Sequence, residues 1–242
     1  MKKQMIVIPI LVALIVTLPV SATGDYSEML VVDAIATWDV VEAPDVPFSL
    51  FWSGSGKWLA ESGSKMQFTI SSVDDDIEGT LTLGNHTWMG NDTDIANDLV
   101  LGVFGLTPFL PGLFIETSND SLEDLTTQAM ASAFRTFGNY LNGTMESGIE
   151  DVTVSSGSYR CIAFDYTQDE SGWGEPQRTT LAYDLSSGIL VFANTTYSFG
   201  VPYSLVLEYS GIIVPPSPLV WASLILIVGV VVIVGILVVK RR

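Results

Sequence analysis

The sequence has little of what extracellular catalysis usually requires. Histidine occurs once, at His86, and cysteine once, at Cys161. A single histidine without cysteine partners makes a poor zinc site, and we expect His86 to face solvent on a strand. One cysteine excludes a disulfide within the chain, so we expect Cys161 to be a small buried hydrophobe rather than a reactive thiol. These scarcities predict a non-enzymatic protein without a cofactor, with carboxylate-only catalysis as the alternative left open.

Basic residues are also scarce. Only Lys57, Lys65, Arg135, Arg160 and Arg178 lie between Thr23 and Ser217, whereas all 27 acidic residues of the chain lie there. So acidic a surface repels nucleic acid and anionic lipid headgroups and attracts cations. Nucleic acid is therefore excluded as a partner, and cations are expected to be attracted.

Long apolar runs are confined to the two ends of the chain. Residues 1–22 have a basic start, a short apolar stretch and small residues before a cleavage site after Ala22, which predicts a signal peptide. Residues 219–239 are uninterruptedly apolar and long enough for a transmembrane helix. The basic tail 240–242 places the C-terminus in the cytoplasm. Residues 23–214 are thus expected outside the cell membrane, on a proline-rich stalk of residues 215–218.

Five of the asparagines in this outer segment begin an Asn-X-Ser/Thr triplet, which is more than random placement would give. They are Asn85, Asn91, Asn119, Asn142 and Asn194. Such triplets are acceptors for N-glycosylation in exported proteins. Asn194 stands in a strand-like run that is apolar on both sides through Phe192, so we expect that strand to emerge at the sheet's rim, at a bulge, by Asn194.

Alternating or β-branched runs predict strands through most of the outer segment. They cover residues 29–41, 65–73, 77–87, 159–167, 179–183, 189–197 and 203–209. Short turns at residues 74–76 and 184–188 indicate two antiparallel hairpins. In the last run Tyr203, Leu205, Leu207 and Tyr209 should share one covered face.

Helix signals are fewer. Ser121 with Asp124 predicts the capping box of a helix whose apolar residues recur at three- and four-residue spacing to Leu141. Gly138 or Gly143 would end it, and a shorter helix is expected over residues 94–101. The fold class is therefore α+β: an antiparallel, curved β-sheet packed by one or two helices, followed by a single C-terminal transmembrane helix.

Two acidic runs raise the question of calcium. Residues 74–78 contain four acids, and Asp92, Asp94 and Asp98 form a second group. Neither run has the Asp-X-Asp-X-Asp-Gly spacing of a calcium loop. A solvated turn and a helix start are the favoured interpretations, and we predict no metal site.

Residues 101–115 are fifteen uncharged, mostly apolar residues within the outer segment. Pro108 and Pro111 interrupt it, which rules out a second membrane span. It is either core filling or an apolar groove. In the second case the contacts to an apolar ligand would come from the side chains of Phe104, Phe109, Leu113 and Phe114.

The layout of the chain supports a resemblance. The block YRCIAFDYTQDESGWGEPQRTTLAYDLSSGILVFANTTYSFGVPYSLVLEYSGI, with the leader and the stalk, resembles uncharacterised archaeal surface proteins of Asgard type. The resemblance implies a type I membrane-anchored ectodomain at the cell surface. It carries over no activity and no functional residue.

Two functions fit these observations. The first is a glycosylated, membrane-anchored ectodomain that binds an apolar ligand such as lipid, or another envelope component. The second is a structural coat or adhesion module that self-associates in the presence of cations.

Overall fold

The computed structural model describes residues 25–45, 48–50, 56–58, 60–99, 111–133, 142–170, 174–198 and 202–216. The elements are β1 Ile35–Glu42, β2 Phe48–Leu50, β3 Gly56–Trp58, β4 Lys65–Val73, β5 Ile77–Leu83, β6 His86–Asn91, α1 Asp92–Asp98, α2 Asn119–Ser132, β7 Gly143–Val154, β8 Gly157–Gln168, β9 Arg178–Asp184, β10 Leu190–Ser198 and β11 Pro202–Ile213. The two helices lie between β6 and β7, and the remaining elements are strands.

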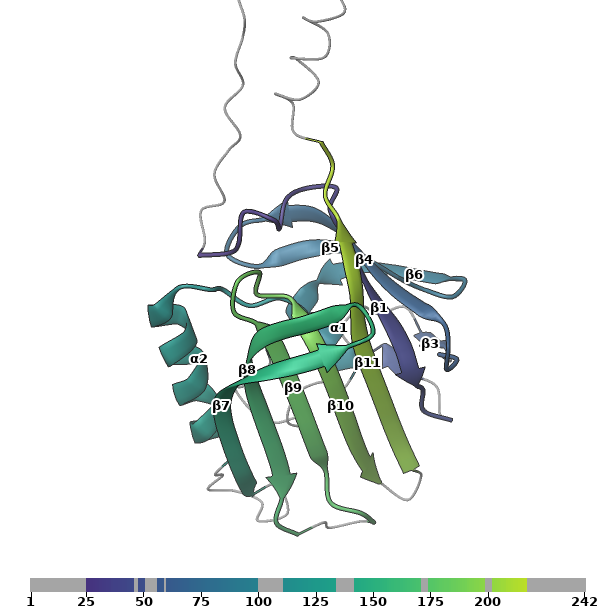
Figure 1. Ribbon diagram of the computed structural model, residues 1–242. Helices are drawn as coiled ribbons and strands as arrows, with labels where there is room; N and C mark the ends of the chain where they lie inside the picture. Colours follow the sequence, from purple (N-terminus) through teal and green to yellow (C-terminus); the bar gives the residue numbers. More distant parts are fainter. Residues whose placement is uncertain are drawn as a thin grey trace, which may run out of the picture.

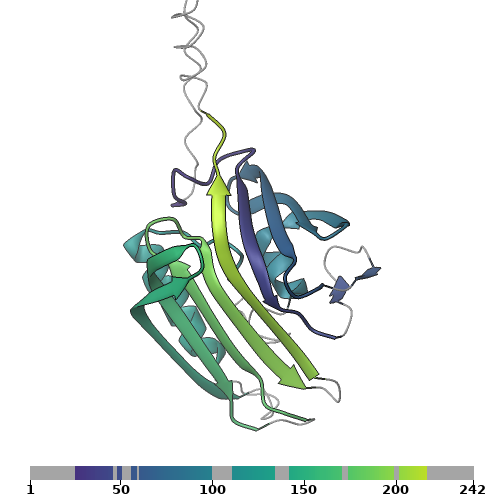
Figure 2. The ribbon, with the colours of Figure 1, turned by 45° about the vertical axis from the view of Figure 1, so that its right-hand side comes forward.

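Nine of these strands form one antiparallel sheet, which confirms the α+β class. Their order is β6-β5-β4-β1-β11-β10-β9-β8-β7, and β2 and β3 form a separate pair. All neighbours but one in the large sheet are consecutive or nearly consecutive along the chain. The exception is the pairing of β1 with β11, which runs from Ile35 opposite Ile213 to Glu42 opposite Val206. The sheet twists strongly across this seam (Figures 1 and 2).

Strand β11 shows why the sheet has one covered face. Tyr203, Leu205, Leu207 and Tyr209 are each at most 6% exposed, whereas the residues between them are half-buried. This confirms the predicted alternation. Successive strand side chains point to opposite faces, so the apolar set of each strand meets the apolar set of its neighbour.

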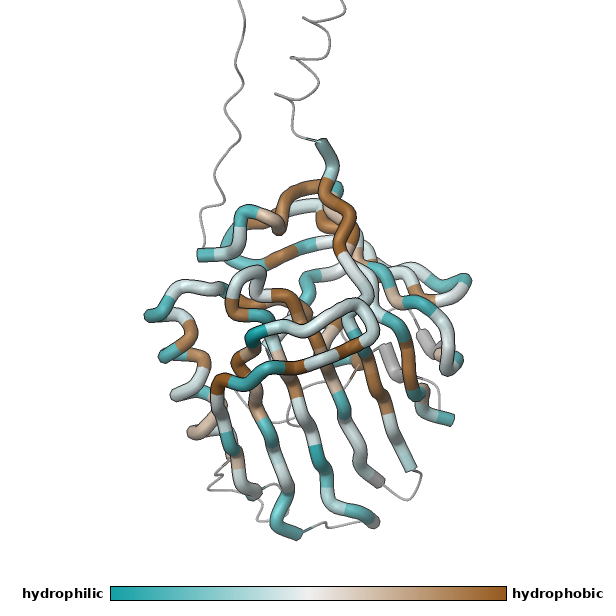
Figure 3. Tube along the Cα trace, in the orientation of Figure 1, coloured by the Kyte–Doolittle hydropathy of each residue, from teal (hydrophilic) through white to brown (hydrophobic). Residues whose placement is uncertain are grey.

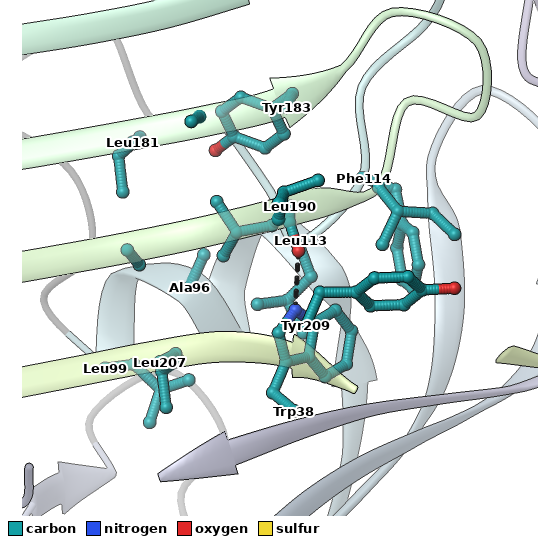
Figure 4. Packing of buried hydrophobic residues seen from close by; sticks show 14 of the residues in the cluster. Trp38, Ala96, Leu99, Leu113, Phe114, Leu181, Tyr183, Leu190, Leu207 and Tyr209 are labelled. Atoms are coloured by element: carbon teal, nitrogen blue, oxygen red, sulfur yellow. Dashed lines mark hydrogen bonds between the residues drawn. The ribbon is translucent and has the colours of Figure 1, made fainter. Parts of the chain in front are cut away.

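The covered face packs against α1 and a segment of residues 111–115. Trp38 of β1 is fully buried at its centre, and its indole Nε1 donates to the backbone oxygen of Leu190, 2.7 Å away (Figure 4). The ring of Phe114 lies edge-on to Trp38, with centroids 6.0 Å apart, and to Phe68, at 5.5 Å. Edge-to-face pairs of this kind stabilise a core beyond their area burial.

The tip of the long β7–β8 hairpin crosses the opposite face of the sheet in front of β9, β10 and β11 (Figure 1). The Ser156 hydroxyl at its turn donates to the backbone oxygen of Tyr209, and the Tyr159 and Tyr209 rings meet edge to face. Cys161 is fully buried, and burial raises the pKa of its thiol to about 12. This confirms that Cys161 is a buried hydrophobe.

The predicted strands are confirmed in kind, and the short pair β2 and β3 was not predicted. Three further differences concern the large sheet. The run at 29–41 begins only at Ile35, because Asp33 has a left-handed φ of 67° that ends the extended backbone before the strand. The run at 77–87 is two strands, since Gly84 with φ 58° turns the chain back on itself. Strand β7 was not predicted, because as the edge strand it exposes many polar side chains. Both predicted hairpin turns are confirmed.

The helix starts also differ from the predictions. Ser118, not Ser121, caps α2: its hydroxyl accepts from the backbone N–H of Ser121. The cap therefore lies one turn earlier, and the helix begins at Asn119. The predicted continuation to Leu141 and the stop at Gly138 lie outside the described residues, and Gly143 begins β7. The short helix α1 is confirmed, beginning two residues before its predicted start.

The predicted signal peptide and the predicted transmembrane segment both lie outside the described residues. Within the described ranges, neither helix has the length and apolarity that crossing a membrane would need.

Replacement of Trp38 by phenylalanine tests the centre of the core. The variant loses the Nε1 hydrogen bond and leaves the buried oxygen of Leu190 unpaired, which should lower the free energy of unfolding by about 1–3 kcal/mol. Urea denaturation of the full chain in detergent measures this. Ile149→Ala, at a side chain 57% exposed, is the control and should change stability little. Equal stability of W38F and wild type would contradict the central role of this hydrogen bond.

Candidate functional site

Of the four predicted apolar contact residues, two lie in the core and two lie outside the described residues. Leu113 and Phe114 are 0% and 3% exposed and pack in the core, as expected of core filling. Phe104 and Phe109 lie outside the described residues. Ligand contact at these four positions stays a prediction, and for Leu113 the side chain already has a packing role.

The segment that holds Leu113 and Phe114 is tied to the turn between β9 and β10. The backbone N–H of Ile115 donates to the oxygen of Gly188 at 2.8 Å, and that of Leu190 donates to Leu113 at 3.0 Å. Gly188 has φ 71°, and a Cβ there would lie 2.0 Å from the oxygen of Ile115. Only glycine therefore allows this approach without a shift of the backbone.

Asp92, the first residue of α1, is an acid buried beneath this segment. It is 1% exposed; one carboxylate oxygen, Oδ2, accepts from the backbone N–H of Phe114 at 3.0 Å. Among the described residues, the other oxygen, Oδ1, is buried without a donor of the kind that Oδ2 has in Phe114. Gly112 lies so close that a Cβ there would stand 1.8 Å from Oδ2. The side chain of Asp92 is therefore enclosed by the segment that covers it.

The partner of this acid is a second acid. Asp76, from the turn between β4 and β5, lies within hydrogen-bonding reach of the Asp92 carboxyl. Burial first, and the hydrogen bond and charge of Asp76 next, raise the pKa of Asp92 well above its usual range. We infer that Asp92 holds a proton, because a buried carboxyl beside a second acidic side chain does not ionise cheaply.

More acidic groups surround the pair. Asp75 and Glu116 join Asp92 and Asp76 in raising the pKa of Tyr26, after burial as the main cause. Burial also raises the pKa of Asp94, one turn into α1. Within the described part of the chain, no lysine or arginine is among the groups that shift these pKa values. The proton on Asp92 therefore neutralises the buried carboxylate, which a lysine or arginine side chain would otherwise have to do.

The two acidic runs in the sequence gave no hint of this contact. They were considered as separate calcium sites, whereas the fold joins one member of each, because β5 and β6 return the chain to the turn that follows β4. Among the described residues, no three histidine, cysteine or carboxylate side chains are grouped as metal ligands. The arrangement can hold and exchange a proton.

A cavity of about 290 Å³ lies beside the acid pair, between residues 111–116 and α2. Its apolar lining comes from Phe114, Ile115 and Leu125, and Glu116, Asp124 and Gln128 add polar groups. Thr93, Pro111, Gly112 and Ser121 complete the wall. Its lining combines apolar surface with negative charge, and the sequence predicted only its Phe114 side.

The five glycosylation triplets occupy different environments. Asn85, in the turn between β5 and β6, and Asn119, at the start of α2, are exposed. Asn91 and Asn142 are half-buried, and the Asn91 side chain caps α1 by accepting from Asp94 N–H at 2.6 Å.

Asn194 does not lie at the rim of the sheet as predicted. It stands within β10 between Thr180 of β9 and Val206 of β11. Its Oδ1 is buried and has no hydrogen-bond partner within the part of the chain that the structure describes. The irregularity in strand pairing comes earlier, between Leu190 and Phe192. The strand therefore continues through Asn194, since both neighbouring strands extend beyond it.

Comparisons with protein-family models, with curated proteins and with solved structures gave no match. The resemblance to archaeal surface proteins stays a prediction.

The acid pair predicts a specific pH dependence of stability. The folded protein binds the Asp92 proton more tightly than the unfolded chain, so stability is present below about pH 4 and is lost as pH rises toward the raised pKa. Asp92→Asn keeps an acceptor for Phe114 N–H and needs no proton. Its free energy of unfolding should exceed that of wild type at about pH 8 and approach it at about pH 4.

Denaturant unfolding of the full chain over this pH range makes the measurement. Asp75→Asn is the matched control, because Asp75 is an exposed acid of the β4–β5 turn that also holds Asp76. It should leave most of the pH dependence of the unfolding free energy in place. If D92N keeps the wild-type slope, Asp92 is not the group that titrates.

Proposed function

We propose that this protein is a glycosylated type I membrane protein of the cell surface, and that its outer domain binds a small ligand. Residues 219–239 form the membrane span, and residues 240–242 form the cytoplasmic tail. The sheet domain lies outside the cell and has no enzymatic role. The cavity between residues 111–116 and α2 is the observation that carries ligand binding.

The positions of the described ends support a single anchored domain. The first described segment, before β1, and the end of β11 lie at the same end of the sheet (Figures 1 and 2). A leader removed before residue 23 and a span that starts at residue 219 are thus both attached to one end of the domain. The sheet's other end is free to face outward.

The lining of the cavity indicates the class of ligand. Phe114, Ile115 and Leu125 offer contact to an apolar body, and Glu116 and Asp124 favour a cationic group. We therefore refine the apolar ligand of the sequence analysis to a small amphiphile with a positive group. The cavity volume of about 290 Å³ suits a headgroup-sized molecule rather than a long chain.

The coat or adhesion module is the second candidate. Strands β6 and β7 are the edges of the large sheet in the described part of the chain. Unpaired edges are surfaces on which further strands can add. The acidic surface would oppose such contact until cations screened it.

Native mass spectrometry of the glycosylated full chain, with and without calcium, tests both candidates. We expect a co-purifying small molecule that is lost from Asp124→Lys and from Gln128→Trp. Both residues are exposed on α2 and line the cavity, so neither change should disturb the core. An affinity loss of about tenfold or more is expected from the reversed charge.

Glu123→Lys makes the same change of charge on an exposed residue of α2 that does not line the cavity, and it should retain the ligand. Loss of the ligand from E123K as well would indicate a general charge effect. A bare protein that forms oligomers only with calcium would favour the coat or adhesion module.

Glycan occupancy should follow exposure. We expect Asn85 and Asn119 to be occupied, because both side chains are exposed, and Asn194 to be empty, because its Oδ1 is buried between neighbouring strands. Enzymatic removal of the glycans in heavy-oxygen water, followed by peptide mass spectrometry, marks each occupied site. A fully occupied Asn194 would contradict the burial argument.

A further inference from the structure

Four of the large apolar side chains that the domain exposes gather at one end. Met29 is 42% exposed, Val32 51%, Ile213 66% and Val214 42%. This is the end at which the described chain stops at Pro216. Figure 3 shows apolar segments at the end of β11 and along the adjoining segment before β1. We call these four residues the end patch.

The fold at residues 27–34 explains why the end patch is exposed. Backbone hydrogen bonds from Leu30 to Ser27 and from Ala34 to Val31 form two successive turns. Leu30 and Ala34 point into the core, at 1% and 0% exposed. The same turns leave Met29 and Val32 facing outward, because inward positions are already filled.

Strand pairing brings the two halves of the end patch together. Ile35 at the start of β1 lies opposite Ile213 at the end of β11. Val32 lies three residues before Ile35, and Val214 directly follows Ile213. The patch therefore comes from both ends of the described chain.

The other large apolar side chains that are exposed among the described residues are dispersed. Val41 is on β1, Met89 on β6, Met130 on α2 and Ile149 on β7. Single exposed apolar residues are ordinary on protein surfaces, whereas a group of them marks an interaction surface.

Chain length limits what can cover the end patch. Five residues, 214–218, separate Ile213 from the proposed span, and a fully extended chain of that length reaches roughly 17 Å. The headgroup layer occupies about 5–8 Å outside the hydrocarbon core. The end patch is thus held within about 10 Å of the headgroups even when the stalk is fully extended.

We propose that the end patch rests on the membrane, with its apolar side chains at the boundary of headgroups and acyl chains. This inference depends on the proposed membrane anchor, and it assigns the bilayer as the occupant of a surface that the ligand cavity does not use. Docking fixes the orientation of the domain and holds the acid pair close to the membrane.

Charge at this end selects the kind of lipid. Asp25, Glu28, Asp33, Asp74 and Asp75 are exposed on the segment before β1 and on the β4–β5 turn. Anionic headgroups would be repelled by these carboxylates, whereas the choline of a zwitterionic headgroup would be attracted. We therefore expect docking on phosphatidylcholine and weaker docking when anionic lipid is added.

A fluorescent probe on the full chain in phosphatidylcholine vesicles tests this proposal. Bimane is attached to Val32→Cys, and quenching by lipids with a shallow nitroxide label is measured. Cys161 is fully buried and its thiol pKa is raised to about 12, so it should not take the probe. Thr167→Cys, at an exposed residue next to the end of β8, is the control. Strand β8 ends at the end of the sheet opposite to that where β11 ends (Figure 1).

We expect quenching at residue 32 to be several times that at residue 167. Met29→Asp should reduce quenching at residue 32, whereas Met89→Asp, at a side chain 73% exposed on β6, should not. Equal quenching at residues 32 and 167 would overturn the proposal. Stronger quenching with anionic lipid would overturn the choice of headgroup.

Flotation of the vesicles after alkaline washing separates this inference from the proposed function. A chain that floats but shows no quenching at residue 32 is anchored without docking. A chain that is washed off has no span, and both proposals then fail.

Discussion

The pairing of β1 with β11 is the constraint on which the rest of the structure depends. It joins two sets of strands, β4 to β6 on one side and β7 to β10 on the other, into one nine-stranded sheet. Trp38 of β1 reaches across this seam to the backbone of Leu190 and packs against Tyr209. Both ends of the described chain are brought to one end of the sheet as a result.

The seam also determines where the acid pair lies. Residues 111–115 pack on the face of the sheet centred on Trp38 and are hydrogen-bonded to the β9–β10 turn. Helix α1 comes from the other set of strands, because it directly follows β6 in the chain. Asp92 is enclosed where these parts meet, and Asp76 reaches it from the β4–β5 turn. A buried carboxyl with no positive partner holds its proton, so the stability of this junction depends on pH.

Much of the sheet could be predicted, because most strands have one covered and one wetter face and their side chains alternate accordingly. Strand β11 is the clearest example, and β4 has the predicted bounds. Strand β7 escaped prediction because an edge strand with Glu146, Glu150 and Asp151 exposed shows no apolar alternation. The cap of α2 was misplaced because Ser118 and Ser121 are equally good candidates in sequence, and only the backbone decides between them.

By itself the sequence determined local character: which segments extend, the buried role of Cys161, and the acidity of the described domain. These properties depend only on residues that are close in the sequence, so periodicity and composition predict them without knowledge of the fold. The tertiary structure decided which distant groups meet. Asp76 with Asp92, residues 111–116 with α2, and Ile35 with Ile213 are all separated in sequence and joined only by strand pairing and core packing.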